Sequence, residues 1–205
     1  MILCDIGNTT YHFKTDSMVY KENVTTFSPN TIKEKVFYIN VNKNISPKLL
    51  ELENWIDITS YIEKDLYYET MGIDRVVACE AIYDGIIVDA GSAITIDRMK
   101  NGVFMGGFIF PGIDAMQKCF TNISKALEYS FNFECDLDIM PKNSQDAISY
   151  GYLKTLYSEV TSYEQPIYLT GGDAQKFKSL FKDAKVDEFL LFDGMKKIIQ
   201  KAKLC

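Results

Sequence analysis

The stretch Ile86–Thr95 (IIVDAGSAIT) decides the fold of this chain of 205 residues. It is an apolar run that ends in an aspartate and continues into a turn of small residues. An apolar run bounded by turn residues is typical of a strand buried on both faces, and such a strand tolerates charge only at its end. We therefore expect Asp89 at the rim of a site, where Gly91 lets the backbone approach a ligand.

The first ten residues (MILCDIGNTT) repeat this pattern, because Asp5–Asn8 (DIGN) aligns without a gap with Asp89–Ser92 (DAGS). Each copy is followed by further strand-like residues, so the repeat predicts a duplicated α/β architecture of two lobes with a cleft between them. Backbone amides beside such a glycine can hold phosphate, and a nearby carboxylate suits Mg²⁺. A plain β-turn, with the aspartate bonding its own backbone, is the alternative for either copy.

Composition narrows the class of protein. Hydrophobic residues make up 47% and charged residues 24%, as in ordinary globular proteins. A net charge of −6 without a dense basic tract argues against nucleic acid as the main partner. No apolar run is as long as a membrane span, and the start of the chain lacks the features of a signal peptide. We expect no membrane partner.

Five widely spaced cysteines predict free thiols and a cytoplasmic location rather than a disulfide framework or a zinc site. Cys4 and Cys79 lie in apolar runs and are expected in the core. The single histidine, His12, has no cysteine or aspartate cluster near it and is expected to be a bystander on sequence context alone.

The pattern of residues predicts strands at 1–6, 11–14, 18–22, 36–40 and 54–58 in the first part of the chain. In the second part it predicts strands at 86–90, 95–99, 103–110, 167–169 and 188–192. Helices are expected from residue 72, from 112, from 144 to about 162, from 173 to about 182 and from 194 to 203. Ser144 is expected to cap its helix, and Gly151 within that helix predicts close backbone packing or the approach of a ligand.

Gly72–Arg75 (GIDR) opens a helix and carries two candidate functional residues. Asp74 could accept the proton of an alcohol, or it could simply be a helix N-cap. Arg75 is one of only two arginines, and its planar fork suits an anionic group. Tyr67 and Tyr68 could wall a substrate pocket or pack together at a lobe surface.

Two later segments complete the pattern. Gly171-Gly172 follows a short apolar strand and precedes a helix, which suits a third phosphate contact but also a plain strand–helix joint. In the helix after Gly112, apolar residues recur at spacings of three and four and form one face, for the core or for a partner subunit. They are Ile113, Met116, Phe120, Ile123 and Leu127.

Taken together, these motifs resemble those of the type III pantothenate kinases, which belong to the superfamily of acetate and sugar kinases, Hsp70 and actin. The matching segments are DIGNT at Asp5–Thr9, GIDR at Gly72–Arg75, DAGSAIT at Asp89–Thr95 with Asp97 after it, GGFIFPG at Gly106–Gly112 and TGGD at Thr170–Asp173. They span nearly the whole chain in the order found in the family.

The resemblance implies a duplicated ribonuclease H-like (actin-like ATPase) fold, with a mixed sheet flanked by helices in each lobe. The expected lobes are residues 1–70, with the first phosphate loop, and residues 71–205, with the catalytic helix, the cation site and a dimer helix. The implied reaction is ATP-dependent phosphorylation of pantothenate to 4′-phosphopantothenate, the first step of coenzyme A biosynthesis. Family members are homodimers with the substrate pocket at the subunit junction.

The resemblance also implies roles for individual residues. Asp74 would be the general base, and Asp89 would bind a monovalent cation, K⁺ or NH₄⁺. ATP and its phosphates would be held by Asp5, Ile6, Gly7, Asn8, Thr9, Thr10, Tyr11, His12, Ser92, Gly171 and Gly172, with Asp5 also holding Mg²⁺ through water. Pantothenate would be held by Gly72, Ile73, Asp74, Arg75 and Ser144, with a tyrosine that the sequence does not assign between Tyr67 and Tyr68.

The chain departs from the family at three points. Ser92 and Ser144 stand where the family usually has threonine, and the first lobe is shorter than in most members. Two other functions stay open at this stage: a regulatory or accessory homologue that binds nucleotide without turnover, and a kinase of another small alcohol or sugar. Intact Asp74, Arg75 and Asp89 favour an enzyme, because a protein that only binds nucleotide does not need a base.

Overall fold

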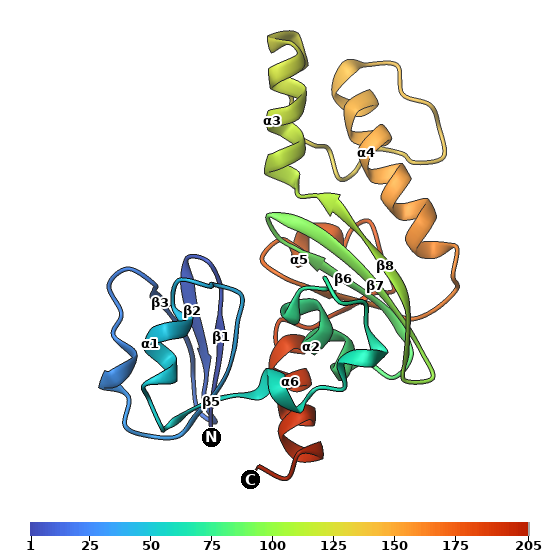
Figure 1. Ribbon diagram of the computed structural model, residues 1–205. Helices are drawn as coiled ribbons and strands as arrows, with labels where there is room; N and C mark the ends of the chain where they lie inside the picture. Colours follow the sequence, from blue (N-terminus) through green and yellow to red (C-terminus); the bar gives the residue numbers. More distant parts are fainter. Residues whose placement is uncertain (205) are drawn as a thin grey trace. The chain divides into compact units, whose positions relative to one another are not determined.

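The computed structural model describes residues 1–204. The chain divides into two compact units, one formed by Met1–Ala81 with Leu190–Cys205 and the other by Ile82–Phe189. Each unit is built on one five-stranded sheet (Figure 1). None of the helices in the described part combines the length and the hydrophobicity that crossing a lipid bilayer requires.

The sheet of the first unit has the strand order β3-β2-β1-β4-β5. Its strands are β1 (Ile2–Ile6), β2 (Thr10–Lys14), β3 (Val19–Asn23), β4 (Val36–Asn40) and β5 (Trp55–Asp57). The first three form an antiparallel meander, while β4 runs parallel to β1 and β5 runs parallel to β4. All five strands lie where the sequence predicts them.

The second sheet repeats this plan in the order β10-β9-β6-β7-β8. Its strands are β6 (Gly85–Ala90), β7 (Ala93–Lys100), β8 (Val103–Pro111), β9 (Ile167–Thr170) and β10 (Lys185–Val186). Again three strands form an antiparallel meander and two later strands are added in parallel. Because strand order and direction match one for one, the duplication predicted from the two Asp-x-Gly segments is confirmed.

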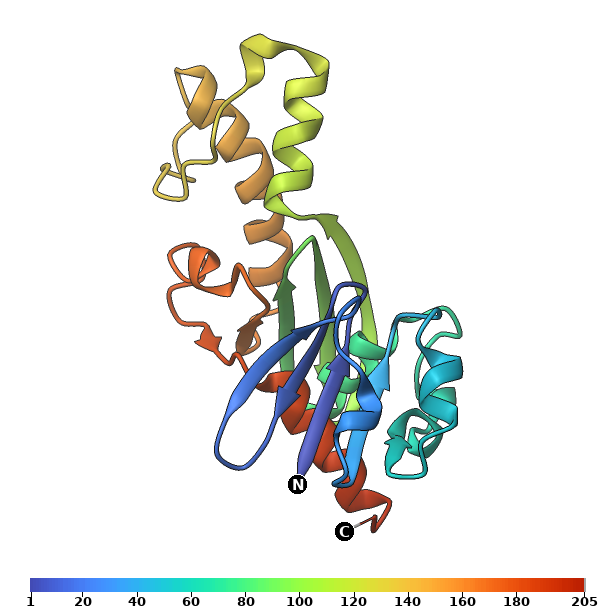
Figure 2. The same ribbon diagram turned by 90° about the vertical axis from the view of Figure 1, so that its left-hand side faces the viewer.

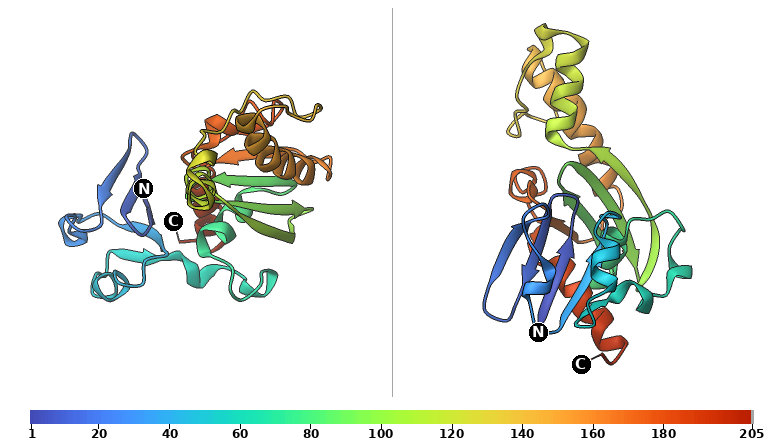
Figure 3. Two further views of the ribbon diagram at one scale, coloured as in Figure 1. Left: turned by 90° about the horizontal axis from the view of Figure 1, so that it is seen from above. Right: turned by 60° about the vertical axis from the view of Figure 1, so that its left-hand side comes forward.

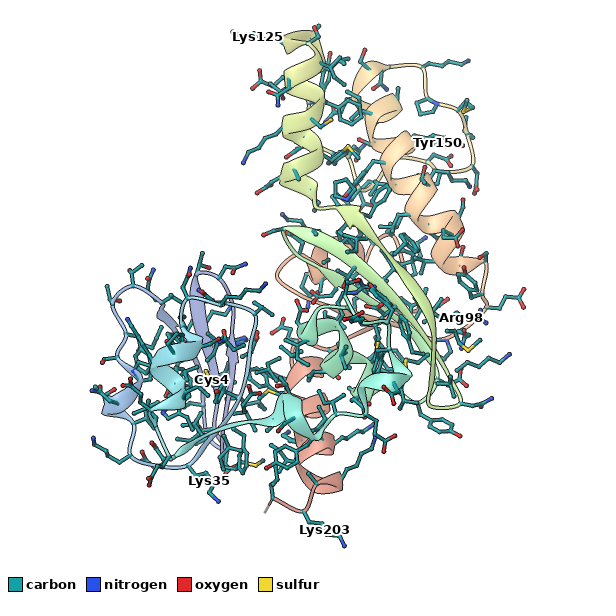
Figure 4. All side chains as sticks on the ribbon, in the orientation of Figure 1. Cys4, Lys35, Arg98, Lys125, Tyr150 and Lys203 are labelled. Atoms are coloured by element: carbon teal, nitrogen blue, oxygen red, sulfur yellow. The ribbon has the colours of Figure 1, made fainter. Side chains whose placement is uncertain are left out.

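Helices cover both faces of the first sheet. They are α1 (Ser46–Leu50), α2 (Ile73–Ala81) and α6 (Leu190–Lys201). The unit also has three short 3-10 helices, at Pro29–Thr31, Ile58–Tyr61 and Lys64–Leu66. One face packs Cys4, which Figure 4 labels, and Trp55 against Leu49 of α1. Cys4 and Cys79 are both buried, as predicted. On the other face the ring of His12 meets Phe192 of α6 at 4.9 Å between ring centroids.

The helices of the second unit are α3 (Ile113–Ile123), the 3-10 helix Lys125–Leu127, α4 (Ser144–Thr161) and α5 (Ala174–Phe177). The C-terminal part of α4 packs its apolar side chains on β6 and β7. Beyond that contact, α3 and the start of α4 lie side by side past one end of the sheet (Figures 2 and 3). The Tyr152 hydroxyl joins α4 to β8 by donating to the Pro111 carbonyl at 2.6 Å.

Three local predictions were wrong. Residues 190–192 begin helix α6 rather than a strand, because Leu190, Ile198 and Ile199 form one buried helical face. The helix after Gly172 is the single turn α5, because the chain bends away after Phe177. The cap of α4 is Asn143 instead of Ser144, since the Asn143 Oδ1 accepts the Asp146 amide at 2.9 Å.

Gly151 differs from the sequence prediction as well. It is exposed on α4, and a Cβ built there meets no atom of the described residues within 4 Å. The glycine that does pack closely is Gly194 in the middle of α6. A Cβ on Gly194 would overlap the backbone carbonyl of Val77 in α2, so α2 and α6 cross at this point with their backbones in contact.

The two compact units are a different division of the chain from the lobes expected at residues 1–70 and 71–205. Helix α2 belongs with the first sheet because it packs along α6, and the Lys197 ammonium donates to the Ala81 carbonyl at 2.6 Å. The lobe boundaries of the family therefore stay a prediction.

We predict that Gly194→Ala destabilises the protein, because the added methyl group must push α2 away from α6. Overpacking of this kind costs roughly 1–3 kcal/mol, and each kcal/mol lowers Tm by roughly 2–4 °C in a chain of this size. The matched control is Gly151→Ala, which should leave Tm unchanged or raise it, since alanine is the better helix former. Equal Tm values for the two variants, measured by circular dichroism, would contradict the close crossing.

Candidate active site

The first Asp-x-Gly segment is a hairpin turn between β1 and β2. The Gly7 amide donates to the Thr10 carbonyl at 2.9 Å, and the Val24 amide donates to the Thr9 carbonyl at 3.0 Å. Asp5 precedes the turn on β1, directly across from His12 on β2. The turn itself presents exposed Asn8 and Thr9, so the structure places a short, surface-exposed backbone loop next to a carboxylate.

Three other residues expected to bind phosphate lie within strands. Ile6 and Tyr11 are buried in the core of the first unit, so only their backbone groups can take part in binding. Burial raises the pKa of Tyr11 to about 12. Burial, followed by the charge of Lys21, lowers the pKa of His12 to about 4. His12 is therefore uncharged near neutral pH, and a phosphate contact from it stays a prediction.

The second Asp-x-Gly segment ends strand β6 in the second unit. Asp89 pairs with Thr95 on β7 and with Thr170 on β9, and directly paired residues project from the same face of a sheet. A carboxylate with a hydroxyl on each side is an all-oxygen set of the kind that hard cations prefer. Sequence reasoning missed both threonines, because only the strand register brings them beside Asp89.

Glycines bring the three small-residue motifs of the second unit together. A Cβ on Gly112 would overlap the carbonyls of Gly91 and Ser92, and a Cβ on Gly171 would overlap the Asp89 carboxylate and the Ala90 carbonyl. Gly171 also has φ of +88°, which disfavours any residue with a side chain. The FPG and TGG segments therefore rest directly on the turn after β6.

The surface of this junction carries the groups expected to contact ATP. Ser92 and Gly172 are exposed, and Gly171 is half-buried. The Gly112 amide donates to the Ser92 carbonyl at 3.2 Å, and the Asp173 amide donates to the Ala90 carbonyl at 2.9 Å. These bonds fix the two loops on the turn, so the structure brings Asp89, Ser92, Gly171 and Gly172 together as the sequence predicts.

Helix α2 of the first unit carries Asp74 in its first turn. Asp74 is the second residue of the helix, and its Oδ1 accepts the Arg75 amide at 2.9 Å. A Cβ on Gly72 would lie 2.5 Å from the same oxygen. Glycine at position 72 therefore leaves the space into which the Asp74 carboxylate turns, which explains why these two residues occur together.

Arg75 is buried, with 6% of its surface exposed. Its Nη1 donates to the Tyr68 hydroxyl at 2.6 Å, and its guanidinium lies 5.8 Å from the centroid of the Tyr68 ring. The adjacent Tyr67 turns elsewhere, because its hydroxyl donates to Glu80 Oε1 at 3.0 Å. The two tyrosines therefore differ in their partners, and Tyr68 is the one that contacts a predicted substrate-binding residue.

A cavity of about 760 Å³ lies beside this helix in the first unit. Its walls include Tyr67, Tyr68, Ile73 and Val76, together with Tyr38 from β4. A cavity of this size accommodates a small organic molecule. Tyr67 and Tyr68 thus line a pocket, as one of the two sequence interpretations predicts.

Ser144, the remaining predicted substrate contact, is an exposed residue of the second unit at the start of α4. Within residues 1–204, no three histidine, cysteine, aspartate or glutamate side chains come close enough to hold a metal ion. Bound cations would therefore depend on at most two such side chains in this part of the chain, together with hydroxyl, carbonyl or water oxygens.

The duplicated sheet, with a small-residue turn after a strand-end aspartate in each half, defines the fold class as the duplicated ribonuclease H-like fold that actin-like ATPases and sugar kinases share. A solved structure of a 2-dehydro-3-deoxygalactonokinase from Sinorhizobium meliloti shares the fold, with a TM-score of 0.56 at 8% identity over 98% of this chain and 96% of that one. The sequence profile of the type III pantothenate kinases matches residues 53–165. The chain belongs to the type III pantothenate kinase family and is a kinase.

Two relatives that match over nearly their full length carry the name of this family. A type III pantothenate kinase of Sulfurimonas denitrificans is 60% identical over all of both chains, and one of Campylobacter jejuni is 42% identical over 98% of this chain and 97% of its own. A crystal structure from Campylobacter jejuni, described as a Baf family transcriptional activator, has a TM-score of 0.88 at 40% identity and full coverage of both chains.

We predict that Gly72→Ala lowers kcat by about tenfold or more, because the methyl group forces the Asp74 carboxylate to rotate away, and small misplacements of reacting groups are costly. Tm should change little, since the methyl group meets a movable side chain. Steady-state kinetics and thermal unfolding check both points. Adding Gly72→Ala to an Asp74→Asn protein should cause no further loss; a fully additive loss would contradict the proposed coupling.

Proposed function

We propose that this chain transfers the γ-phosphoryl group of ATP to the hydroxyl group of pantothenate, giving 4′-phosphopantothenate, the first step of coenzyme A biosynthesis. The observation that carries the proposal is the start of α2, where Gly72, Asp74 and Arg75 are arranged in a chain 60% identical to a named type III pantothenate kinase. We also propose a cytoplasmic location, supported by the four free thiols of the described residues.

Asp74 acts as the general base in this proposal. Phosphoryl transfer requires little covalent chemistry from the protein, so positioning and proton acceptance account for most of the contribution of the side chains. The carboxylate is held toward the space beside Gly72 and accepts the proton of the acceptor hydroxyl as the phosphoryl group arrives. A base within hydrogen-bonding reach contributes roughly 10²–10⁴-fold to such a step.

The acceptor lies in the cavity beside α2, with its carboxylate toward Arg75. The buried guanidinium offers several N–H donors in one plane, and the Tyr68 hydroxyl orients that plane. Ser144 supplies a further hydroxyl contact. The protein acts as a homodimer with this pocket near the subunit junction, and the apolar face of α3 supports this assembly because Ile123 at its end is 69% exposed.

The phosphates of ATP are held by the two Asp-x-Gly turns. In the first unit the Gly7–Thr10 loop faces the phosphates, and Asp5 would hold Mg²⁺ through water, which suits a half-buried carboxylate near the end of β1. In the second unit Ser92 and the Gly171-Gly172 amides contact the nucleotide. When bound, Mg²⁺ would neutralise part of the negative charge of the phosphates.

Asp89, Thr95 and Thr170 would hold a monovalent cation, K⁺ or NH₄⁺. One carboxylate with two hydroxyl groups balances a single positive charge. Such a cation adds a fixed charge beside the turn that contacts the nucleotide.

A nucleotide-binding homologue without turnover is not favoured. The relatives with 60% and 42% identity are named as kinases over their whole length, and this chain keeps the residues that only an enzyme needs. A kinase of a neutral alcohol or sugar has no need of the buried Arg75 guanidinium, which is bonded to Tyr68 in the cavity wall.

We predict that Asp74→Asn lowers kcat with pantothenate by roughly 10²–10⁴-fold, because asparagine keeps the shape of the side chain but cannot accept the proton. The dissociation constant for ATP should change by less than about twofold, since Asp74 contacts the acceptor. ADP release measures the first quantity and calorimetry the second. Turnover at the rate of the unsubstituted enzyme would show that Asp74 serves only the helix.

We predict that replacing K⁺ by Na⁺ lowers kcat or the affinity for ATP several-fold, because a smaller ion fits poorly between Asp89 and the threonines. The variant Asp89→Asn should have low activity that no longer distinguishes the two salts. Initial rates at equal ionic strength in KCl and NaCl measure this. Equal rates in both salts for the unsubstituted enzyme would remove the cation from the mechanism.

A further inference from the structure

Asn42 is a buried polar residue that has no part in the site proposed above. It follows β4, and only 7% of its surface is exposed. Burying an amide side chain costs free energy unless hydrogen bonds replace those lost to water. The Asn42 Nδ2 donates to the backbone carbonyl of Asn8 at 3.2 Å, 34 residues earlier in the chain. This bond connects the segment after β4 to the Gly7–Thr10 loop.

The orientation of the Asn42 amide is fixed by its partners. Its Oδ1 accepts the Asn44 amide at 3.0 Å, while its own backbone amide donates to Asn40 Oδ1 at 2.8 Å. A flipped side chain would place Nδ2 against an N–H donor and Oδ1 against a carbonyl acceptor. Nδ2 must therefore point to Asn8, and the Asn40–Asn44 segment forms a rigid support behind the loop.

The bond to Asn8 determines where the next amide points. In a trans peptide the carbonyl of one residue and the N–H of the following residue point in opposite directions. Because the Asn8 carbonyl is directed at Asn42, the Thr9 N–H is directed away from it. The Thr9 carbonyl belongs to the next peptide and is held separately by the Val24 amide. The Asn8–Thr9 peptide is therefore oriented through its carbonyl by the side chain of Asn42.

We infer that Asn42 is a positioning residue for ATP: it fixes the plane of the Asn8–Thr9 peptide so that the Thr9 N–H donates to a phosphate oxygen. The inference rests on the proposed function, in which the Gly7–Thr10 loop holds the phosphates. A carboxylate at position 42 would repel the Asn8 carbonyl, and a shorter side chain would not reach it. An amide is the side chain that meets both requirements.

The test compares Asn42→Ala and the isosteric Asn42→Asp with a matched control, Asn54→Ala. Asn54 lies in the same unit and also donates to backbone carbonyls, those of Ile32 at 2.9 Å and Glu34 at 2.8 Å, but away from the loop. Both Asn42 variants should raise KM for ATP roughly three- to tenfold while KM for pantothenate stays within about twofold. The Asn54 variant should lower Tm and leave both KM values unchanged.

A purely structural role would give a different result. If the Asn42 variants lose only Tm, or raise both KM values equally, the inference is overturned. The variant Gly7→Ala tests the phosphate-binding role of the loop independently of Asn42. The fold tolerates this change, because a Cβ on Gly7 meets only the Thr10 carbonyl, at 3.6 Å. If Gly7→Ala leaves KM for ATP unchanged, the loop does not bind the phosphates and the proposed function is wrong at this point. If Gly7→Ala raises KM for ATP but neither Asn42 variant does, the loop binds the phosphates and only the positioning role of Asn42 is overturned.

A measurement on the unsubstituted protein does not depend on any variant folding. Titration with Mg-ADP, followed by ¹⁵N NMR, should shift the Thr9 amide and the Asn42 side-chain amide and leave the Asn54 side-chain amide in place. Shifts at Asn54 equal to those at Asn42, or none at Thr9 and Asn42, would contradict the inference.

Discussion

The contact on which the second unit depends is backbone against backbone at the end of β6. Gly112 and Gly171 approach the Asp89–Ser92 turn so closely that neither position has room for a Cβ. This packing holds the start of α3 and the loop after β9 on one turn, and it leaves Ser92 and Gly172 exposed at the same place. The proposed nucleotide contacts lie together here because the glycines have no side chains, rather than because large side chains converge.

In the first unit, side chains rather than glycine contacts stabilise the corresponding turn. Its Gly7–Thr10 turn has ordinary space around Gly7, and Asn42 supports it from behind. Helix α2, which carries the proposed base Asp74, is fixed at several points along its length. Gly194 of α6 touches Val77, Lys201 pairs with Glu80 at 2.6 Å, and the Tyr68 hydroxyl accepts a hydrogen bond from Arg75. The duplicated halves thus share strand order but differ in how each turn is stabilised.

Local patterns predicted much of this arrangement. Alternation and turn residues located the ten strands except the last, and the two Asp-x-Gly segments predicted the duplication. The sequence could not show that Thr95 and Thr170 flank Asp89, because strand register is set by tertiary pairing. Nor could it show Asn42 behind Asn8, since a polar Asn-rich segment looks like an ordinary loop. The strand predicted at residues 188–192 was wrong, because a short apolar run suits a strand or a buried helix equally well.

We propose that three acidic residues far apart in the chain, Asp5, Asp74 and Asp89, act on one triphosphate and its acceptor. The most direct measurement is a crystal structure of the protein with a non-hydrolysable ATP analogue, Mg²⁺, K⁺ and pantothenate. We expect the phosphates between the Gly7–Thr10 turn and Ser92, with Asp74 within hydrogen-bonding distance of the acceptor hydroxyl. An analogue bound away from these turns, or a pantothenate hydroxyl out of reach of Asp74, would contradict the account.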